Sequence, residues 1–226
     1  MLAHLNRRRE HGMSLVELMI GLAIGLVVVA AAAVLLLGQI REQRAMLVEG
    51  RLMQDLRTSM DIITRDLRRS GYWGGAPARM HASASTPENP YTAISPALAA
   101  SDAVSFRMSR DITENNSVDD NEQFGFRLRN GVIEMLIGGG SWQALTDVGT
   151  MTVVSFVVTP DVQELSLQGM CEKACVEGTS ACGPTLQVRS LTVAITGRAA
   201  VDSKVRRTLA SQVRVRNDAV VGACSV

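Results

Sequence analysis

A run of twenty residues without a charged side chain, Leu18–Leu37, constrains this chain more than any other feature. As a helix the run would be about 30 Å long, which matches the hydrocarbon core of a bilayer. A helix on the surface of a globular core would carry a polar face, and this run has none. It therefore predicts a membrane-spanning helix. Arg7, Arg8 and Arg9 precede it, so we expect a cytoplasmic N-terminus and a C-terminal part outside the cytoplasm.

Glu17 stands directly before the apolar run and five residues after Gly12. A carboxylate at the edge of the hydrocarbon is unfavourable, although the cost is smaller there than at the bilayer centre. Two interpretations are open: the side chain extends to the cytoplasmic interface, or it pairs with an amine of another chain. A cut between Gly12 and Met13 would create an α-amino group four residues before Glu17. A neighbouring chain could then place that amine against the carboxylate.

Residues 7–18, RRREHGMSLVEL, resemble the class III signal of type IV prepilins and type II secretion pseudopilins. In that family a short basic leader ends in glycine, and the mature helix carries glutamate at its fifth position. The resemblance implies that prepilin peptidase cuts between Gly12 and Met13 and that Met13 becomes the N-methylated terminus. It also implies that Glu17 serves assembly and sets the register between subunits. The family usually has phenylalanine where this chain has Met13.

A conventional secretory signal peptide and an uncleaved membrane anchor are the competing interpretations. The basic start, the apolar run and the alanines at Ala30–Ala33 would fit a cut near Ala32. However, the apolar run continues through Val34–Leu37, whereas the apolar region of a signal peptide is typically about 7–15 residues long. The prepilin signal is therefore the preferred interpretation.

Beyond the apolar run, the helix is expected to continue to about Ser70, because good helix formers dominate and no proline occurs before Pro77. Asp61 and Arg65 are one of several opposite-charge pairs at i,i+4 spacing on its polar side. Gly71 is predicted to end the helix. An apolar stripe at 3.5-residue spacing predicts packing against the chain's own globular part. The stripe consists of Met46, Met53, Leu56, Met60, Ile63 and Leu67.

Glycine and proline make residues 71–103 loop-rich, and β signals dominate after them. The dipeptide Asn130-Gly131 predicts a hairpin turn. We expect an α+β fold in which a long N-terminal helix, membrane-spanning in its first half, packs on a mainly antiparallel β-sheet. The sheet should have about five to seven strands, and type IV pilins share this architecture. Strands are predicted over residues 103–108, 123–128, 131–137, 142–145, 151–159, 191–196 and 209–216.

Two further stretches resemble PilW-like minor pilins. They are DLRRSGYWGG, residues 66–75, and VRVRN, residues 213–217. Many of those proteins have cysteine where this chain has Gly75, so a disulfide from that position is absent here. The expected organisation is a prepilin leader over 1–12, the transmembrane half of the helix over 13–37 and its periplasmic half over 38–70. A globular, β-rich periplasmic domain follows over 71–226.

The four cysteines, Cys171, Cys175, Cys182 and Cys224, all lie in the last quarter of the chain. An even number of cysteines in a periplasmic domain indicates disulfides, with three possible connectivities. We expect one local bond among the first three and one bond that ties the C-terminal tail through Cys224, with the pairing left open. A zinc site is disfavoured because the spacing is loose and no histidine is near. No metal site is predicted.

Two charged groups invite a functional interpretation and have a simpler one. Asp119, Asp120 and Glu122, with Asn121, contain oxygen ligands suitable for calcium, but the EF-hand spacing is missing, so a solvated loop is preferred. An arginine strip could face DNA, although a solvated face of the sheet is preferred and no specific nucleic-acid partner is predicted. The strip consists of Arg107, Arg110, Arg127 and Arg129.

Composition excludes most catalytic classes. The chain has three histidines, of which only His81 lies in the mature part, and it contains neither a GxSxG nor a P-loop motif. We therefore predict no enzymatic activity, no catalytic residues and no cofactor. The resemblance implies a minor pilin that is processed by prepilin peptidase and is incorporated into, or primes, a type IV pilus. Alternatives are a J-type pseudopilin of type II secretion and a conventionally secreted periplasmic binding domain.

The same resemblance implies partners and a location. The partners are prepilin peptidase, other minor pilins, the major pilin, the inner-membrane pilus assembly machinery and the membrane itself. The protein should cross the inner membrane once, with its N-terminus in the cytoplasm and its C-terminal domain in the periplasm, and should lie in the pilus once assembled.

Overall fold

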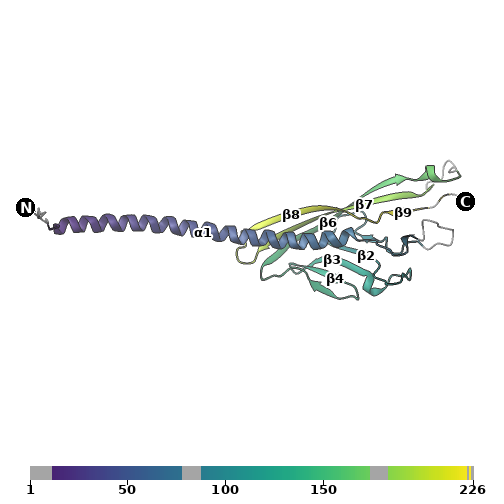
Figure 1. Cartoon of the computed structure of the whole chain (residues 1–226), viewed down its shortest axis with the longest axis horizontal. Helices are drawn as coiled ribbons and strands as arrows, with labels where there is room; N and C mark the ends of the chain where they lie inside the picture. Colours follow the sequence, from purple (N-terminus) through teal and green to yellow (C-terminus); the bar gives the residue numbers. More distant parts are fainter. Residues whose placement is uncertain (1–11, 78–87, 174–182, 223, 225–226) are drawn as a thin grey trace, which may run out of the picture. The chain divides into compact units, whose positions relative to one another are not determined.

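The computed structural model describes residues 12–77, 88–173, 183–222 and 224 (Figure 1). One long helix, α1, runs from Leu15 to Arg68. The chain divides into two compact units, Met1–Leu47 and Val48–Val226, so the first part of α1 belongs to the first unit and the rest to the second. The predicted helix and the end that Gly71 gives it are confirmed, since Gly71 has a φ of +75°. That left-handed conformation favours glycine.

The second half of α1 buries one apolar stripe against the strands of its own unit. Leu56, Ile63 and Leu67 are completely buried, and Met60 is nearly so. These residues follow one another at three- and four-residue steps, which places them on one helix face. Met46 is an exception to the predicted stripe, because it is 71% exposed and lies in the first unit, where all the described residues are exposed.

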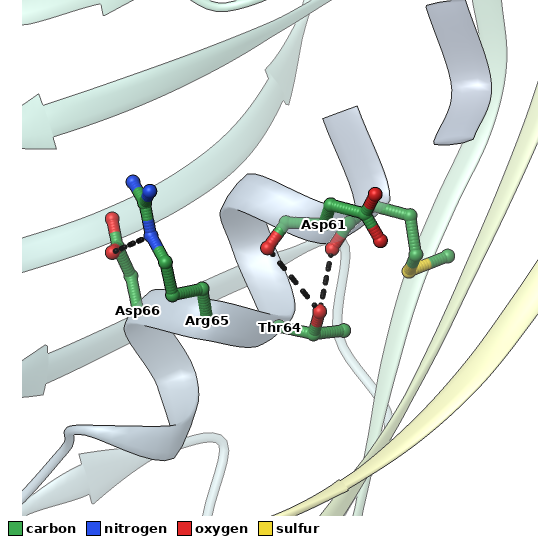
Figure 2. Close-up of polar contacts among 5 residues, drawn as sticks. Asp61, Thr64, Arg65 and Asp66 are labelled. Carbon is green, nitrogen blue, oxygen red and sulfur yellow. Dashed lines mark hydrogen bonds and ion pairs between the residues drawn. The ribbon is translucent and has the colours of Figure 1, made fainter. Parts of the chain in front are cut away.

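The polar side of this helix differs from the prediction in one detail (Figure 2). The expected pair between Asp61 and Arg65 is not among the ion pairs of the described residues. Arg65 instead lies beside Asp66, with 3.6 Å between Arg65 Nε and Asp66 Oδ1. The Thr64 hydroxyl donates to the carbonyl of Met60 at 2.8 Å and lies 3.4 Å from that of Asp61. Arg65 is largely exposed, so solvent screens either arrangement and the difference carries little stability.

The first sheet is antiparallel and follows chain order from β1 to β5. Asn130 and Gly131, with φ of 52° and 76°, form the predicted tight turn between β3 and β4. A short 3₁₀ helix, Asp120–Glu122, precedes β3. The strands are Ile94–Ser95 (β1), Ala103–Arg107 (β2), Gln123–Arg129 (β3), Val132–Ile137 (β4) and Trp142–Ala144 (β5).

The second sheet is antiparallel in the order β6-β7-β8, with β9 also paired to β7. A bulge between Val153 and Ser155 interrupts β6, so Val153 and Phe156 both face the core although they are three residues apart. A 3₁₀ helix, Gln168–Met170, follows β6. The strands are Met151–Ser166 (β6), Thr185–Ala199 (β7), Arg206–Arg214 (β8) and Ala219–Val221 (β9).

One hydrophobic core joins α1 to both sheets. It contains Leu56 and Ile63 of the helix, Phe106 and Phe126 of the first sheet, and Val193 of the second, with other apolar residues. The α+β class is therefore confirmed, with the second half of α1 alongside the strands in Figure 1. In one detail the structure differs from the prediction: the strands form two antiparallel sheets rather than one, and an isolated bridge between Ser101 and Val158 links them.

Candidate functional site

The N-terminal segment carries the residues that the sequence singled out. Met13 is 69% exposed, α1 begins at Leu15, and Glu17 lies in the first helical turn. A carboxylate in the first turn interacts favourably with the partial positive charge at a helix N-terminus. None of the ion pairs in the described part of the chain involves Glu17. The leader residues 1–11 lie outside the described residues.

The apolar run forms a long stretch of helix surface that the described fold leaves uncovered. Every residue from Gly12 to Met46 is exposed, and among the described residues α1 is the one helix long and apolar enough to cross a membrane. Because so much apolar surface is unfavourable in water, this segment requires hydrocarbon or other apolar helices around it. Its length and composition are those of a membrane anchor.

The other end of α1 is closed by the C-terminal stretch VRVRN. The Arg216 N–H donates to the carbonyl of Arg68 at 3.1 Å. The Asn217 side-chain amide donates to the carbonyl of Ser70 at 2.9 Å, and Ser70 is completely buried. The last carbonyls of a helix have no partner within the helix, so these bonds satisfy groups that would otherwise remain unpaired. The stretch therefore fastens the end of the helix to the tail.

Arg189 holds the same junction from the other side. It is 6% exposed and lies on the core-facing side of β7, two residues before Leu191. Its guanidinium donates to the carbonyl of Asn217 at 2.9 Å and to the carbonyl of Thr92. Burial lowers the pKa of Arg189, and the negative charge of Asp218 acts in the opposite direction. Arg189 thus joins the tail to the loop before β1.

The GYWGG stretch, residues 71–75, forms the start of this junction and contacts the loop before β3. The Trp73 indole N–H donates to the side-chain oxygen of Asn116 at 2.9 Å, and the Gly74 N–H donates to Glu114 Oε2 at 3.0 Å. A Cβ atom on Gly75 would lie 2.6 Å from the Trp73 ring, so the folded indole itself requires glycine at that position. This contact gives a local reason for glycine at this position.

The acidic group before β3 is partly structural, which corrects the expectation of a solvated loop. Asp120 is exposed, but Glu122 is completely buried and accepts hydrogen bonds from the N–H groups of Arg110 and Asp119 at 2.8 and 2.9 Å. The Tyr91 hydroxyl lies 3.1 Å from Glu122 Oε2, and burial raises the pKa of that hydroxyl. The alternating pattern of the neighbouring strand gave no sign of this buried carboxylate.

These carboxylates are also the described residues that could approach a cation. Ligand oxygens of Asp111, Asp119 and Glu122 lie within 4.8 Å of one another. Main-chain N–H groups already hold Glu122, and Asn115 donates to both aspartates at 3.1 Å. The cluster therefore has a structural explanation that needs no metal.

The arginine strip is divided by the fold. Arg107, Arg127 and Arg129 share the outer face of the first sheet, because they alternate with core residues along β2 and β3. Arg127 forms an ion pair with Glu134 at 2.7 Å, and its guanidinium lies 4.0 Å from the centre of the Trp142 ring. Arg110 follows β2 and lies near the Phe124 ring instead. These contacts fit the preferred interpretation of a solvated sheet face.

One disulfide ties the tail. Cys171, at the end of the second 3₁₀ helix, is bonded to Cys224, with 5.5 Å between their Cα atoms. The expected bond through Cys224 is therefore present, and its partner is Cys171. Cys175 and Cys182 lie outside the described residues, as does His81.

Two family models match this chain, one over most of its globular part and one over its N-terminal segment. A family model described as "Prepilin peptidase-dependent protein B" matches residues 45–215, more than half of the chain. A second model, described as "Prokaryotic N-terminal methylation motif", matches residues 7–33, which include Gly12, Met13 and Glu17. No curated protein and no solved structure matches the chain. Neither family description specifies the PilW-like group, so that part of the resemblance stays a prediction.

Proposed function

The chain belongs to the prepilin peptidase-dependent protein B family, and on that basis we propose that it is a minor pilin that is incorporated into, or primes, a type IV pilus. The observation that carries the proposal is the coincidence of the methylation motif over residues 7–33 with a helix surface that the fold leaves uncovered. The motif supplies the processing step, and the uncovered helix supplies the surface for packing among other pilins.

Processing would occur between Gly12 and Met13. Among the described residues, a Cβ atom on Gly12 would meet no atom within 4 Å. The fold of this chain therefore gives no reason for a glycine at that position. Recognition by a peptidase that needs a small residue before the cut supplies one.

Glu17 would pair with the methylated amine of Met13 in a neighbouring subunit. The described part of this chain offers Glu17 no ion-pair partner, although it lies directly before the apolar run. In a low-dielectric surrounding, an unpaired carboxylate is costly and a paired one is strongly attracted to its partner. The pair would set the axial offset between adjacent helices.

The remaining parts of the proposal concern location and partners. The protein would cross the inner membrane once, with the leader in the cytoplasm and the globular unit in the periplasm, and would be drawn into the fibre by the pilus machinery. Its partners would be prepilin peptidase, other minor pilins and the major pilin. The role is structural rather than enzymatic, and assembly needs no cofactor.

Two substitutions with matched controls test the proposal. Gly12→Val should leave the leader attached, whereas Gly12→Ala keeps a small residue and should be cut normally. Glu17→Gln should be cut normally but should lower co-purification with partner pilins, whereas Glu42→Gln alters an exposed carboxylate farther along the same helix and should not. N-terminal sequencing and the yield of captured pilins are the measurements.

The outcomes separate the steps. Normal cleavage of Gly12→Val, or a mature N-terminus near Ala32, would contradict the prepilin assignment. An unchanged pilin yield for Glu17→Gln would remove the register role of that carboxylate. Recovery of the protein with secretion pseudopilins rather than with pilins would place it in the type II secretion system.

A further inference from the structure

β8 is an edge strand of the second sheet, and no described strand pairs with its outer side. On the side that faces β7, the N–H of Val215 donates to the carbonyl of Arg189 at 2.9 Å, and the N–H of Ala199 donates to the carbonyl of Val205 at 3.0 Å. Both bonds belong to the same ladder, so the odd-numbered residues of β8 form the hydrogen-bonded pairs with β7. The N–H and C=O groups of the even-numbered residues therefore point away from the sheet. These residues are Arg206, Thr208, Ala210, Gln212 and Arg214.

The other edge strands named here are either short or protected on their outer side. β1 and β5 have two and three residues, and the outer side of β6 carries Pro160 and a bridge to Ser101. By contrast, β8 has nine residues, no proline and no break in its register with β7. Soluble proteins normally protect a long edge by one of these devices, because unpaired main-chain groups recruit other strands.

The centre of this edge is accessible and uncharged. The side chains of Thr208, Ala210 and Gln212 are exposed, and among the described hydrogen bonds none is made by their N–H groups. Leu209 packs against the core but is only partly buried, so the core remains incompletely covered at this border. An added strand would satisfy the main-chain groups and cover Leu209.

The positive charges at the start of β8 indicate what kind of strand could pair with its outer side. Arg206 lies directly opposite Arg198 on β7, and Lys204 lies in the turn that connects the two strands. None of these three cations takes part in an ion pair of the described residues. Two copies of β8 paired antiparallel about Ala210 would place Arg206 opposite Arg214. Like charges directly opposite each other are unfavourable, although Asp218 pairs with Arg214 at 2.9 Å and offsets part of this cost. The edge is therefore mismatched to a second copy in this register and matched to a strand with carboxylates at the Arg206 end.

We infer that the outer edge of β8 accepts an extended strand of a different subunit by β-augmentation. That strand is uncharged opposite Thr208–Gln212 and acidic where it meets Arg198 and Arg206. The inference rests on the proposed function, because assembly with other pilin-type subunits supplies the partner. It adds a second contact to assembly, made by the globular unit and independent of Glu17.

Proline at one position tests the main-chain contact. Ala210→Pro removes an outward N–H and leaves the inner ladder intact, since Ala210 is a non-bonded position in the pairing with β7. The matched control Ala210→Val changes the side chain and keeps the N–H. We expect Ala210→Pro to lower the yield of the complex with co-expressed pilin-type subunits at least about tenfold, and Ala210→Val to leave it within about twofold. Thermal melting of both full-length variants in detergent verifies folding.

Hydrogen exchange in the wild-type complex gives an independent result that does not depend on variant folding. The amides of Thr208, Ala210 and Gln212 should exchange rapidly in the isolated chain and at least about tenfold more slowly in the complex. Equal exchange in both states would overturn the inference while leaving processing at Gly12 untouched. A photo-crosslink from Thr208 to a second copy of this chain would also overturn it. Failure of Gly12 processing would instead refute the proposed function and, with it, the assigned partner.

Discussion

Asn217→Ala tests whether the tail fastens the end of α1. The side-chain amide of Asn217 donates to the carbonyl of Ser70 at 2.9 Å and lies 3.5 Å from that of Arg69. Alanine keeps the Asn217 carbonyl that accepts from Arg189. The substitution therefore removes the donors to the helix end and retains the main-chain contact.

The magnitude follows from the burial of the acceptor. Ser70 is completely buried, so its carbonyl would lose a partner without gaining water. An unsatisfied buried acceptor costs about 1–3 kcal/mol of folding free energy. In a unit of this size, each kcal/mol lowers the melting temperature by about 2–4 °C.

Thermal unfolding of the full chain in detergent, followed by tryptophan fluorescence, measures the effect. Trp73 lies two residues beyond Gly71 and reports on the same junction. Arg216→Ala is the matched control, since its main-chain N–H bond to Arg68 is retained and its side chain is exposed. We expect the control to change stability by less than about 0.5 kcal/mol. Equal melting temperatures for the two variants would refute the capping argument.

Two further predictions concern the same unit. Replacing Cys171 and Cys224 together by serine removes a cross-link between residues 53 positions apart. Because the cross-link restricts the unfolded chain, its removal returns entropy to the unfolded state and should destabilise the fold by up to about 4 kcal/mol. Denaturant unfolding measures this change, and a destabilisation below about 1 kcal/mol would contradict the prediction. At Glu114, burial acts to raise the pKa, but hydrogen bonds from neighbouring groups outweigh it and lower the pKa below the ordinary value of 4.5. Its contribution to stability is therefore complete above pH 4.5 and is lost as the pH falls from there through the lowered pKa. Glu114→Gln should flatten the acid side of the stability profile, and an unchanged profile would argue against this contribution.

Features set by neighbours in the sequence were predictable. The helix, its apolar stripe, the Asn130-Gly131 turn and most strands follow from period, propensity and turn chemistry, which act over a few residues. The end of the helix at Gly71 belongs to the same class, because glycine adopts the positive φ found there without strain.

Features that depend on distant residues were not predictable in the same way. The bond from Asn217 to Ser70 joins residues 147 positions apart, and sequence pattern identified the VRVRN stretch without its role. Arg189 could have been noticed, since it shares the parity of Leu191 and Val193 and directly precedes the apolar part of that strand face. The bulge in β6 and the burial of Glu122 depend on which strands share a ladder, and alternation alone does not specify that.

The division of the helix between two units shows how one element can contribute to the core while leaving a surface for the proposed assembly. From Leu52 onward α1 contributes to the core, and at its end the tail supplies hydrogen bonds to it. From Gly12 to Met46 every residue is exposed, so changes there remove no described packing. The effects of two substitutions on the free energy of unfolding add when the two sites share no contacts. Glu17→Gln should therefore leave the stability of the globular unit unchanged, Asn217→Ala should leave cleavage after Gly12 unchanged, and the double variant should show the two single effects side by side. A double variant whose melting temperature falls well below that of Asn217→Ala would mean that the two parts of the helix are energetically coupled.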